Sequence, residues 1–430
     1  MQQLSRQPLR RLTVLLSGLL ALSNVFPANA KPLQEVVATS PFVNNPKALV
    51  DEAWQVVNRE YVDGTFNKND WQQVRRELLA RNYANNLEAY AAIRQSLRKL
   101  GDPYTRFMDP RQFESLTTQT NGEITGIGIS LGESITESKV GKIQILEIVE
   151  KSPADKAGIK VGDHLLSING KSTNALKVSE AAKLIKGEAG QPLTVKLSRA
   201  GKGVFDVTLK RAQIELSSVS YKVKQENKVK VGYIKLVEFS SHSTTQMQDA
   251  VQALNRAKVN AFVLDLRGNP GGLLQNSIEI ARMFLNQGVI VKTIDRKGHS
   301  DESRADQTAI TELPLAVLVD GSSASASEIL AGAIKDNKRG TIVGSATFGK
   351  ALVQSVHPLS DKSGLAVTVA HYYTPNGTDI GHKGVSPDVR VAGLDSFEGP
   401  DSVATSQDVA YQSAVSLFQT GRTTAANVTE

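Results

Sequence analysis

Residues 321–354 place a serine, a lysine and a glutamine where an apolar strand gives way to a helix and then to a glycine loop. Ser325 follows the apolar run 315–319, which is typical of a buried strand, and precedes a helical pattern. A serine on such a turn lies beside the free N–H groups and dipole of a helix N-terminus, which favour developing negative charge. Lys350 follows Gly349 further along the chain. These residue types suit a serine nucleophile whose proton is taken by a neutral lysine.

A lysine can accept this proton only if its pKa lies far below the usual value. An ordinary pKa of about 10.4 keeps the amine protonated at pH 7, and full burial lowers it by about 3–5 units. Phe348, Leu352 and Val353 flank Lys350 and predict an apolar pocket around the amine. The serine could then attack a carbonyl carbon and form an acyl-enzyme, which water hydrolyses.

The same stretch has two simpler interpretations. Ser325 and Glu328 fit a capping box, in which hydroxyl and carboxylate only satisfy the backbone N–H groups of a helix start, and this interpretation stays open. Residues 344–351 nearly match a phosphate-binding loop, but Ala351 lacks the hydroxyl that would bind Mg²⁺. The segment 352–359 also alternates like a strand, whereas a phosphate loop leads into a helix. Nucleotide binding is therefore not expected.

The surrounding sequence resembles the C-terminal processing peptidases, also called tail-specific proteases, which are serine/lysine enzymes with a PDZ domain. The matching segments are 321–333, 347–350 and Gln354. The resemblance implies that Ser325 is the nucleophile, Lys350 the general base and Gln354 a residue that orients the lysine. Glu328, one helical turn beyond the serine, would be a supporting residue. The family usually has glycine where this chain has Ala351, so a positive φ at that position would be strained.

Residues 212–395 alternate strands and helices, and the resemblance implies an α/β protease core of the ClpP/crotonase-like type. Within it, a strand over 261–266 runs into the glycine-rich segment 267–272. Glycines at this place free the backbone to point amides at a reacting centre. By the family pattern, the N–H groups of Gly271 and Ala326 form an oxyanion hole. The alternative for the segment alone is a tight strand-to-helix turn.

Residues 118–211 change to short alternating strands, with a tight hairpin turn at Asn169-Gly170. This block resembles a PDZ domain, and the matching pieces are 152–159, 162–163 and 168–170. In that fold an incoming chain end adds as a strand, and loop N–H groups hold its carboxylate. The residues expected to form this peptide-binding site are Gly126, Ile127, Gly128 and Ile129. The isoleucines would make the pocket apolar, so we expect substrates that end in small or apolar residues.

The first part of the chain has the features of a secretory signal peptide. Arg10-Arg11 precedes an apolar run over 12–22, and Ala28-Asn29-Ala30 is a typical cleavage site. We expect cleavage after Ala30 and an exported protein, in the periplasm or, by resemblance to the cyanobacterial and chloroplast branch, the thylakoid lumen. The alternative is an uncleaved membrane anchor, but the run is short and is broken by Ser17. No later segment is expected to span a bilayer.

The chain has 430 residues, enough for two or three domains. We expect an α/β multi-domain protein with a helical N-terminal region, a β-rich PDZ domain and an α/β catalytic core. The expected boundaries are 1–30 for the signal peptide, 31–117 for the helical scaffold, 118–211 for the PDZ domain, 212–395 for the protease core and 396–430 for a C-terminal helical tail. Within 46–100, apolar residues recur at helical spacing, and Asn69-Asp70 can cap a second helix. Nothing in these helices suggests chemistry, and the resemblance implies that they offer a homodimer contact.

Composition excludes several other functions. Lys plus Arg exceed Asp plus Glu by 50 to 43, a formal net charge of +7. This is a mild bias, and no dense basic run with interleaved aromatic residues is present, so nucleic-acid binding is not expected. The chain has no cysteine and no H-E-x-x-H spacing, and we expect neither a metal nor a cofactor.

Two rivals of other kinds remain. A PDZ adaptor would bind tails without cutting them, although Ser325, Lys350 and Gln354 are all present. A Ser-His hydrolase would use a histidine as base, and the candidates are His164, His242, His299, His357, His371 and His382. None of them has a distinctive neighbour pattern, but such sites are set by geometry and not by sequence position. We predict a serine endopeptidase that recognises protein C-termini through its PDZ domain and cleaves near them.

Overall fold

The structure is a computed structural model that describes residues 45–134, 143–391 and 403–420. The predicted signal peptide and its cleavage site lie outside these ranges, as do both ends of the predicted C-terminal tail. Within the described ranges, no helix combines the length and the apolar character needed to cross a bilayer.

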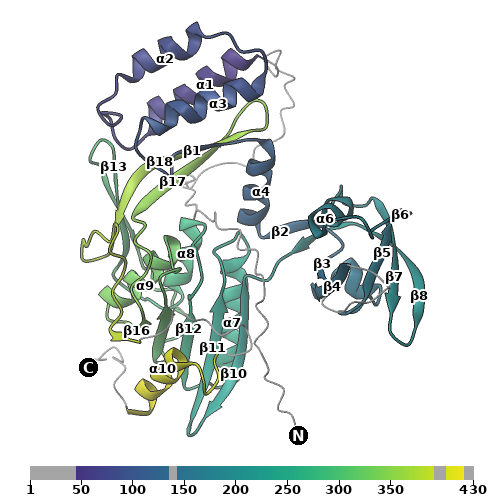
Figure 1. Cartoon of the computed structure of the whole chain (residues 1–430). Coiled ribbons are helices and arrows are strands. Elements are labelled where there is room, and N and C mark those ends of the chain that lie inside the picture. The colour runs from purple at the N-terminus through teal and green to yellow at the C-terminus, as the bar shows by residue number, and fades with distance from the viewer. Residues whose placement is uncertain (1–44, 135–142, 392–402, 421–430) are drawn as a thin grey trace, which may run out of the picture.

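Three helices form the N-terminal unit, as predicted. Their bounds are Pro46–Glu60 (α1), Trp71–Ala80 (α2) and Asn86–Arg98 (α3). Each begins after an Asn or Asp whose side chain accepts a backbone hydrogen bond, and the predicted cap Asp70 precedes α2. Their apolar faces share one buried cluster with Phe107, Leu365 and Val367. The helices are therefore anchored on the strands that carry these residues, at one end of the molecule (Figure 1).

Those strands belong to an antiparallel sheet that joins distant parts of the chain. In spatial order its strands are β1 (Arg106–Met108), β18 (Gly364–Tyr373), β13 (Val289–Asp295) and β14 (Ser300–Arg304), and β17 (Leu352–Pro358) also pairs with β18. Strand β1 directly follows the helical unit, and β17 directly follows the lysine loop. This sheet therefore brings the N-terminal region next to the predicted base.

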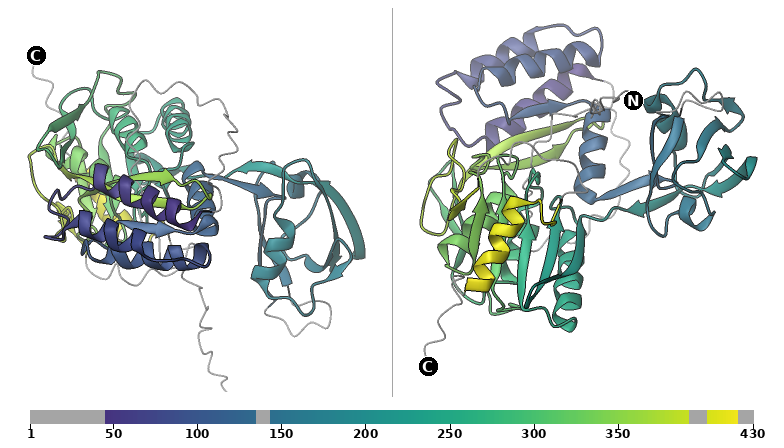
Figure 2. Two further views of the ribbon diagram at one scale, coloured as in Figure 1. Left: turned by 90° about the horizontal axis from the view of Figure 1, so that it is seen from above. Right: turned by 60° about the horizontal axis from the view of Figure 1, so that its bottom comes forward.

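A β-rich lobe follows α4 (Pro110–Asn121). Its elements are β3 (Ile129–Glu133), β4 (Ile143–Ile148), α5 (Pro153–Lys156), β5 (His164–Ile168), β6 (Lys171–Ser172), α6 (Val178–Ile185), β7 (Pro192–Arg199) and β8 (Gly203–Lys210). The predicted hairpin turn is present, with φ of 47° at Asn169 and 80° at Gly170. Two paired strands, β2 (Glu123–Gly126) and β9 (Ala212–Glu215), join the lobe to the body, from which it projects (Figures 1 and 2).

The remaining chain forms a six-stranded sheet of order β10-β11-β12-β15-β16-β19. The strands are β10 (Val219–Glu226), β11 (Val229–Leu236), β12 (Ala261–Asp265), β15 (Leu315–Val319), β16 (Thr341–Gly344) and β19 (Val389–Arg390). Strand β10 pairs antiparallel with β11, and the other neighbours are parallel.

Helices cover both faces of this sheet. One buried cluster joins α7 (Ser243–Arg256), α8 (Leu274–Arg282) and α9 (Ala326–Asp336) to one face, and a second joins α10 (Val409–Thr420, yellow in Figures 1 and 2) to the other. The predicted mixed α/β architecture, with a helical N-terminal region, a β-rich lobe and an α/β core, is confirmed.

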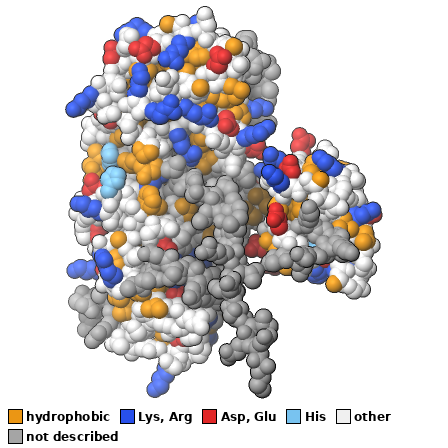
Figure 3. Space-filling model, viewed as in Figure 1, with side chains coloured by type: hydrophobic (Ala, Val, Ile, Leu, Met, Phe, Trp, Pro, Cys, Tyr) orange, Lys and Arg blue, Asp and Glu red, His pale blue; other side chains and the backbone are white. Residues whose placement is uncertain are grey.

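Charged side chains of both signs are interspersed on the face shown in Figure 3. Lys and Arg side chains lie beside Asp and Glu side chains on the helical unit and on the β-rich lobe. The modest net positive charge of the chain is therefore not gathered into one region of this face.

Candidate active site

Parallel strands bring the predicted site residues to one edge of the six-stranded sheet. Strands β12, β15 and β16 are neighbours, so their carboxyl ends meet at the same edge, where open α/β sheets bind ligands. The glycine segment 267–272 follows β12, Ser325 follows β15, and Lys350 follows β16. Three segments that are far apart in the sequence are thus adjacent in space.

Ser325 occupies a strained turn between β15 and α9. Its φ of 53° and ψ of −110° are rarely adopted by a residue other than glycine. The residue is fully buried, and in the described part of the chain its hydroxyl has no hydrogen-bond partner. The N–H of Glu328 donates to the Ser325 carbonyl oxygen (2.8 Å) and not to the hydroxyl. The predicted capping box is therefore only half formed, and the hydroxyl takes no part in it.

The carboxylate of Glu328 fastens the serine turn to the lysine loop. Its Oε2 accepts hydrogen bonds from the N–H groups of Ser325 (2.8 Å) and Lys350 (3.0 Å). Its Oε1 accepts hydrogen bonds from the Thr347 hydroxyl (2.6 Å) and the Gly349 N–H (2.7 Å). Burial raises the pKa of Glu328, while these donors act in the opposite direction. Four donors suit an ionised carboxylate, which has acceptor sites only.

Tyr372, a residue that sequence reasoning missed, links the same two loops. Its hydroxyl lies between the carbonyl oxygens of Ser325 (3.3 Å) and Lys350. The side chain is buried, and burial raises its pKa well above the usual value, so the hydroxyl keeps its proton as a donor. The signal in the sequence is no more than an aromatic residue in a predicted strand.

Lys350 is buried, and its amine contacts Gln354. The residue is 3 % exposed, and its Nζ donates to Gln354 Oε1 at 3.0 Å. Burial lowers the pKa of Lys350 to about 7, helped by the positive charge of Arg106 and opposed by the carboxylates of Asp102 and Glu328. A large fraction of the amine is therefore neutral at pH 7. In the described residues, however, the Ser325 hydroxyl makes no hydrogen bond to it.

One of the three residues expected to desolvate the lysine does not do so. Phe348 is 54 % exposed and points to solvent, because its loop is held from behind by Glu328 and by a hydrogen bond from its N–H to the Ser323 carbonyl. The ring of Tyr104 lies over Lys350 instead, with Nζ 4.9 Å from the ring centroid. The expectation for Phe348 was therefore wrong.

The segment between α3 and β1 completes the surroundings of the lysine. The Gln354 side-chain amide donates to the Tyr104 carbonyl oxygen at 2.6 Å, which fixes the oxygen that faces Lys350. Arg106, two residues further along, supplies the positive charge noted above. No motif in the N-terminal helices or in the strand that follows them indicated that Tyr104 or Arg106 would lie at the site. A turn sequence after a helix carries no signal for such a role.

Glycine is required at position 349 and not at 351. Gly349 has a φ of 89°, and a Cβ there would lie 2.9 Å from the carbonyl carbon of His382. Ala351 has no positive φ and is buried without strain, so the departure from the family pattern does not distort the loop. The segment leads into strand β17 and not into a helix, which agrees with the rejection of a phosphate loop.

The two N–H groups predicted to form the oxyanion hole differ in their hydrogen bonds. Ala326 is the first residue of α9, so its N–H has no acceptor within the helix. The N–H of Gly271 instead donates to Asn269 Oδ1 at 2.9 Å. The expected second donor is therefore engaged inside its own loop, because the Asn269 side chain is buried and folds back on it.

Asn269 also ties the glycine segment to the serine turn. Its carbonyl oxygen accepts hydrogen bonds from the Ala324 N–H (3.0 Å) and the Ser327 hydroxyl (3.0 Å). Its side-chain amide donates to the Leu236 carbonyl oxygen (2.9 Å) at the end of β11. Sequence reasoning did not single out this residue, although an Asn among glycines is a recognisable turn signal.

No histidine is bonded to Ser325, and all six lie in the described ranges. The His357 ring lies 2.6 Å from a Glu60 carboxylate oxygen, and the His299 ring lies 3.3 Å from an Asp295 carboxylate oxygen. His382 contributes its backbone N–H to the Gly349 carbonyl oxygen, while its side chain is exposed.

The four predicted peptide-binding residues lie where the connecting strand β2 leads into the sheet of the β-rich lobe. Gly126 ends β2, and Ile129 starts β3, which lies at the edge of its sheet in the part of the chain that the structure describes. Gly128 has a φ of 80° and packs directly on Ser152. The side chain of Ile127 is fully buried in the core of the lobe, so it does not line a surface pocket as expected.

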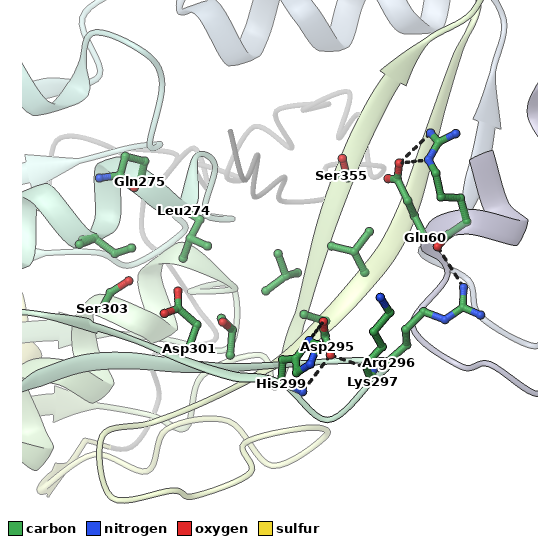
Figure 4. A pocket seen from close by; sticks show the side chains of 16 residues that line it. Glu60, Leu274, Gln275, Asp295, Arg296, Lys297, His299, Asp301, Ser303 and Ser355 are labelled. Atoms are coloured by element: carbon green, nitrogen blue, oxygen red, sulfur yellow. Dashed lines mark hydrogen bonds and ion pairs between the residues drawn. The ribbon is translucent and has the colours of Figure 1, made fainter. Parts of the chain in front are cut away.

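A cavity of about 670 Å³ lies between α8, the β13–β14 hairpin and strands β17 and β18 (Figure 4). Charged side chains of the hairpin, including Asp295, Lys297 and His299, form one side. Apolar side chains form another part of the wall: Leu274, Ile278, Val353, Val369 and Ala370. Leu274 is three residues beyond Gly271, and Val353 adjoins Gln354, so the cavity is near the candidate site.

Comparisons with known proteins agree with this architecture. The sequence pattern of peptidase family S41 matches residues 230–391, and that of the PDZ domain matches residues 144–199. The chain is 38% identical over 404 residues to the carboxyl-terminal-processing protease of Picosynechococcus sp., covering 94% of this chain and 95% of that protein. It is 40% identical over 346 residues to carboxyl-terminal-processing peptidase 2, chloroplastic, of Arabidopsis thaliana, covering 78% of this chain and 67% of that protein.

A solved structure is similar as well. The photosystem II D1 C-terminal processing protease matches with a TM-score of 0.53 and 36% identity, covering 81% of this chain and 93% of that chain. These matches identify a protease with a PDZ domain. The chain belongs to peptidase family S41, among the carboxyl-terminal-processing proteases, as the resemblance implied.

Proposed function

We propose that this protein is an exported serine endopeptidase that cuts proteins near their C-termini, with Ser325 as nucleophile and Lys350 as general base. The observation that carries the proposal is a buried lysine with a pKa of about 7 whose loop shares the Glu328 carboxylate with the serine turn. A neutral amine in such a place can take a proton at physiological pH.

The reaction would proceed in two halves. Neutral Lys350 accepts the Ser325 hydroxyl proton while Oγ bonds to the scissile carbonyl carbon, and the carbonyl oxygen becomes an oxyanion. The Ala326 N–H stabilises that oxyanion, and Gly271 joins when its N–H leaves Asn269. The intermediate then expels the amine, which takes the proton back from the lysine. Water repeats the sequence on the acyl-enzyme and releases the carboxylic acid with the serine restored.

Two adjustments separate this structure from a reacting one. The Ser325 hydroxyl must come within hydrogen-bond reach of the Lys350 amine, and the Gly271 N–H must exchange one acceptor for another. Both adjustments are local. Glu328 already fixes the backbones of Ser325 and Lys350, and Asn269 already ties the glycine segment to the serine turn. Catalytic hydrogen bonds commonly tighten when substrate binds.

The β-rich lobe would capture the substrate tail. Among the described strands, β3 has a neighbour along one edge, β4. An extended chain end can add to the other edge, with its carboxylate at the loop of Gly126 to Ile129. With Ile127 in the core, Ile129 is the residue of this loop left to contact an apolar terminal side chain. We expect tighter binding of peptides that end in a free, apolar carboxyl-terminal residue than of the same peptides with an amidated end, measured by fluorescence anisotropy.

Replacement of the lysine tests the proposed chemistry. Peptide cleavage should be lost in Lys350→Ala and in Ser325→Ala, while tail binding persists in both. Cleavage that survives in Lys350→Ala and disappears on replacement of a histidine would favour the Ser-His hydrolase. An unmutated protein that binds tails and never cleaves them would favour the adaptor.

Export is part of the same proposal. The predicted cleavage after Ala30 gives a mature chain that begins at Lys31. Mass spectrometry of protein isolated from the periplasm or the thylakoid lumen should identify Lys31 as the N-terminal residue. An intact Met1 on the active protein would contradict it.

A further inference from the structure

A buried ion cluster connects the glycine segment to the C-terminal helix. The Arg267 guanidinium is 3 % exposed and donates to Asp265 through Nε (3.0 Å) and Nη2 (2.6 Å). Its other edge donates to Asp408, from Nη1 to Oδ1 (2.9 Å) and from Nη2 to Oδ2 (2.8 Å). Lys235 also contacts Asp265, at 3.2 Å. Two cations and two carboxylates thus balance within the sheet edge, with the guanidinium held on both sides.

Asp408 comes from a part of the chain outside the matched protease region, which ends at residue 391. Its carboxylate also accepts hydrogen bonds from the backbone N–H groups of Ala404 (2.9 Å) and Tyr411 (3.0 Å), at the start of α10. The helix itself is held by apolar packing of Tyr411, Ala414 and Val415 on the sheet face opposite to α9. The carboxylate is therefore a separate link between α10 and Arg267.

Arg267 is the first residue of the segment that leads to Gly271. The next residue, Gly268, donates its N–H to Asp320 (3.0 Å) in the serine turn. Asn269 then holds the Gly271 N–H with its side chain and the Ala324 N–H with its carbonyl oxygen. A displacement of Arg267 would therefore move both the Gly271 N–H and the backbone at Ala324, next to Ser325.

We propose that Asp408 is a positioning residue for the glycine segment 267–272, which carries the proposed oxyanion donor Gly271. The start of α10 would then contribute to catalysis. The proposal rests on the proposed serine mechanism. The bidentate pair fixes one edge of Arg267, and Asp265 fixes the other, which leaves the start of the segment a single orientation. An asparagine at 408 would keep the shape but lose the charge and half of the fork.

The test compares Asp408→Asn with Tyr411→Phe in the full chain. Tyr411 lies on α10 as well, and Tyr411→Phe removes the hydroxyl that donates to Glu226 (2.9 Å) at the end of β10. The variant keeps the ring packing and leaves the contacts between Asp408 and Arg267 untouched. Three quantities are measured: kcat and KM on a peptide substrate, the melting temperature, and the affinity for a peptide aldehyde, which forms a tetrahedral adduct with the serine. The aldehyde adduct depends on oxyanion donors, whereas ground-state binding does not.

We expect Asp408→Asn to lower kcat by tenfold or more, with KM within about twofold, and to weaken aldehyde binding by a similar factor. Tyr411→Phe should keep kcat near the wild-type value. Asp408→Glu keeps the negative charge on a longer side chain, and its kcat should lie between those of Asp408→Asn and Tyr411→Phe. If Asp408→Asn does not fold, the kcat and aldehyde affinity of Asp408→Glu test the proposal. Wild-type kcat or aldehyde affinity in the folded Asp408 variant, or an equal kcat loss in Tyr411→Phe, would overturn the inference. Cleavage that survives in Ser325→Ala would instead reject the proposed mechanism itself.

Discussion

The backbone N–H groups of Ser325 and Lys350 donate to one and the same oxygen, Oε2 of Glu328, at 2.8 and 3.0 Å. Nucleophile and base lie on different loops, after β15 and after β16, so a single carboxylate sets their separation. The hydroxyl of Tyr372 bridges the carbonyl oxygens of the same two residues. The two backbones are thus joined on both their donor and acceptor sides before any substrate arrives.

Glu328→Gln should disrupt this junction. An amide replaces one acceptor oxygen by an NH₂ donor, so two of the four donors lose their acceptor, and at least one of these two is a backbone N–H. The loss should cost about 3 kcal/mol of folding free energy, because buried groups left unsatisfied each cost about 1–3 kcal/mol. We expect kcat/KM to fall more than tenfold. Urea denaturation and peptide hydrolysis check this, and Glu302→Gln, on an exposed strand, is the matched control.

The pH dependence of cleavage should follow the neutral fraction of Lys350. A base must be deprotonated to accept a proton, and the pKa is lowered to about 7 by burial. We therefore expect kcat/KM to rise with pH, to reach half of its plateau near pH 7, and to fall about tenfold per pH unit well below that. A profile that is flat from pH 5 to pH 8 would rule out Lys350 as the base.

Removal of the Arg106 charge should move that profile. This guanidinium lowers the pKa of Lys350, so its replacement by Gln lets the pKa rise and shifts the half-maximal pH upward. Activity at pH 7 should drop, whereas the plateau at high pH should recover most of the wild-type rate. Arg76→Gln, an exposed cation on α2, should leave the midpoint where it is. An unchanged midpoint in Arg106→Gln would remove the electrostatic role.

Lys350→Met should increase stability at neutral pH. The amine titrates near 7 in the folded chain and near 10.5 in the unfolded chain, so between these values the unfolded chain binds more protons. Wild-type stability therefore rises with pH over this window, and the full penalty applies below it. At pH 7 the lysine lowers the folding stability of the wild-type protein by roughly 4 kcal/mol. Lys350→Met removes this penalty but leaves the Gln354 oxygen without a donor, which costs about 2 kcal/mol.

Urea denaturation at pH 6, 7 and 9 measures this difference directly. The stability gain of Lys350→Met should be about 2 kcal/mol at pH 6 and 7 and should shrink toward pH 9. A gain that is the same at all three pH values would show that the lysine carries no titration penalty.

Gly349→Ala should distort the lysine loop. The φ of Gly349 is 89°, and an added methyl group would lie only 2.9–3.0 Å from the backbone of residues 382–384, so there is no room for a side chain. We expect a loss of more than about 2 kcal/mol of folding free energy, with a fall in kcat. Gly158→Ala separates the two causes, since its φ is 73° but nothing lies within 4 Å, and it should cost only about 1 kcal/mol.

Local patterns in the sequence determined much of this protein. Helix caps such as Asp70, the turn at Asn169-Gly170 and the alternation of the strands depend on neighbouring residues, so they can be read along the chain. The short segments around Ser325 and Lys350 likewise indicated the family, which the comparisons confirm. The alternation of strands and helices after residue 212 also agreed with an α/β core, whereas the order of the strands came from the structure.

Only the tertiary structure decided what surrounds those residues. Tyr104 and Arg106 reach the lysine from a segment far earlier in the chain, through the pairing of β1 with β18, while the adjacent Phe348 turns outward. Asp408 reaches Arg267 from the last helix that the structure describes. A lysine becomes a base only when burial and nearby charge lower its pKa, and both depend on which distant segments pack together. That packing is a property of the folded chain and not of any short stretch.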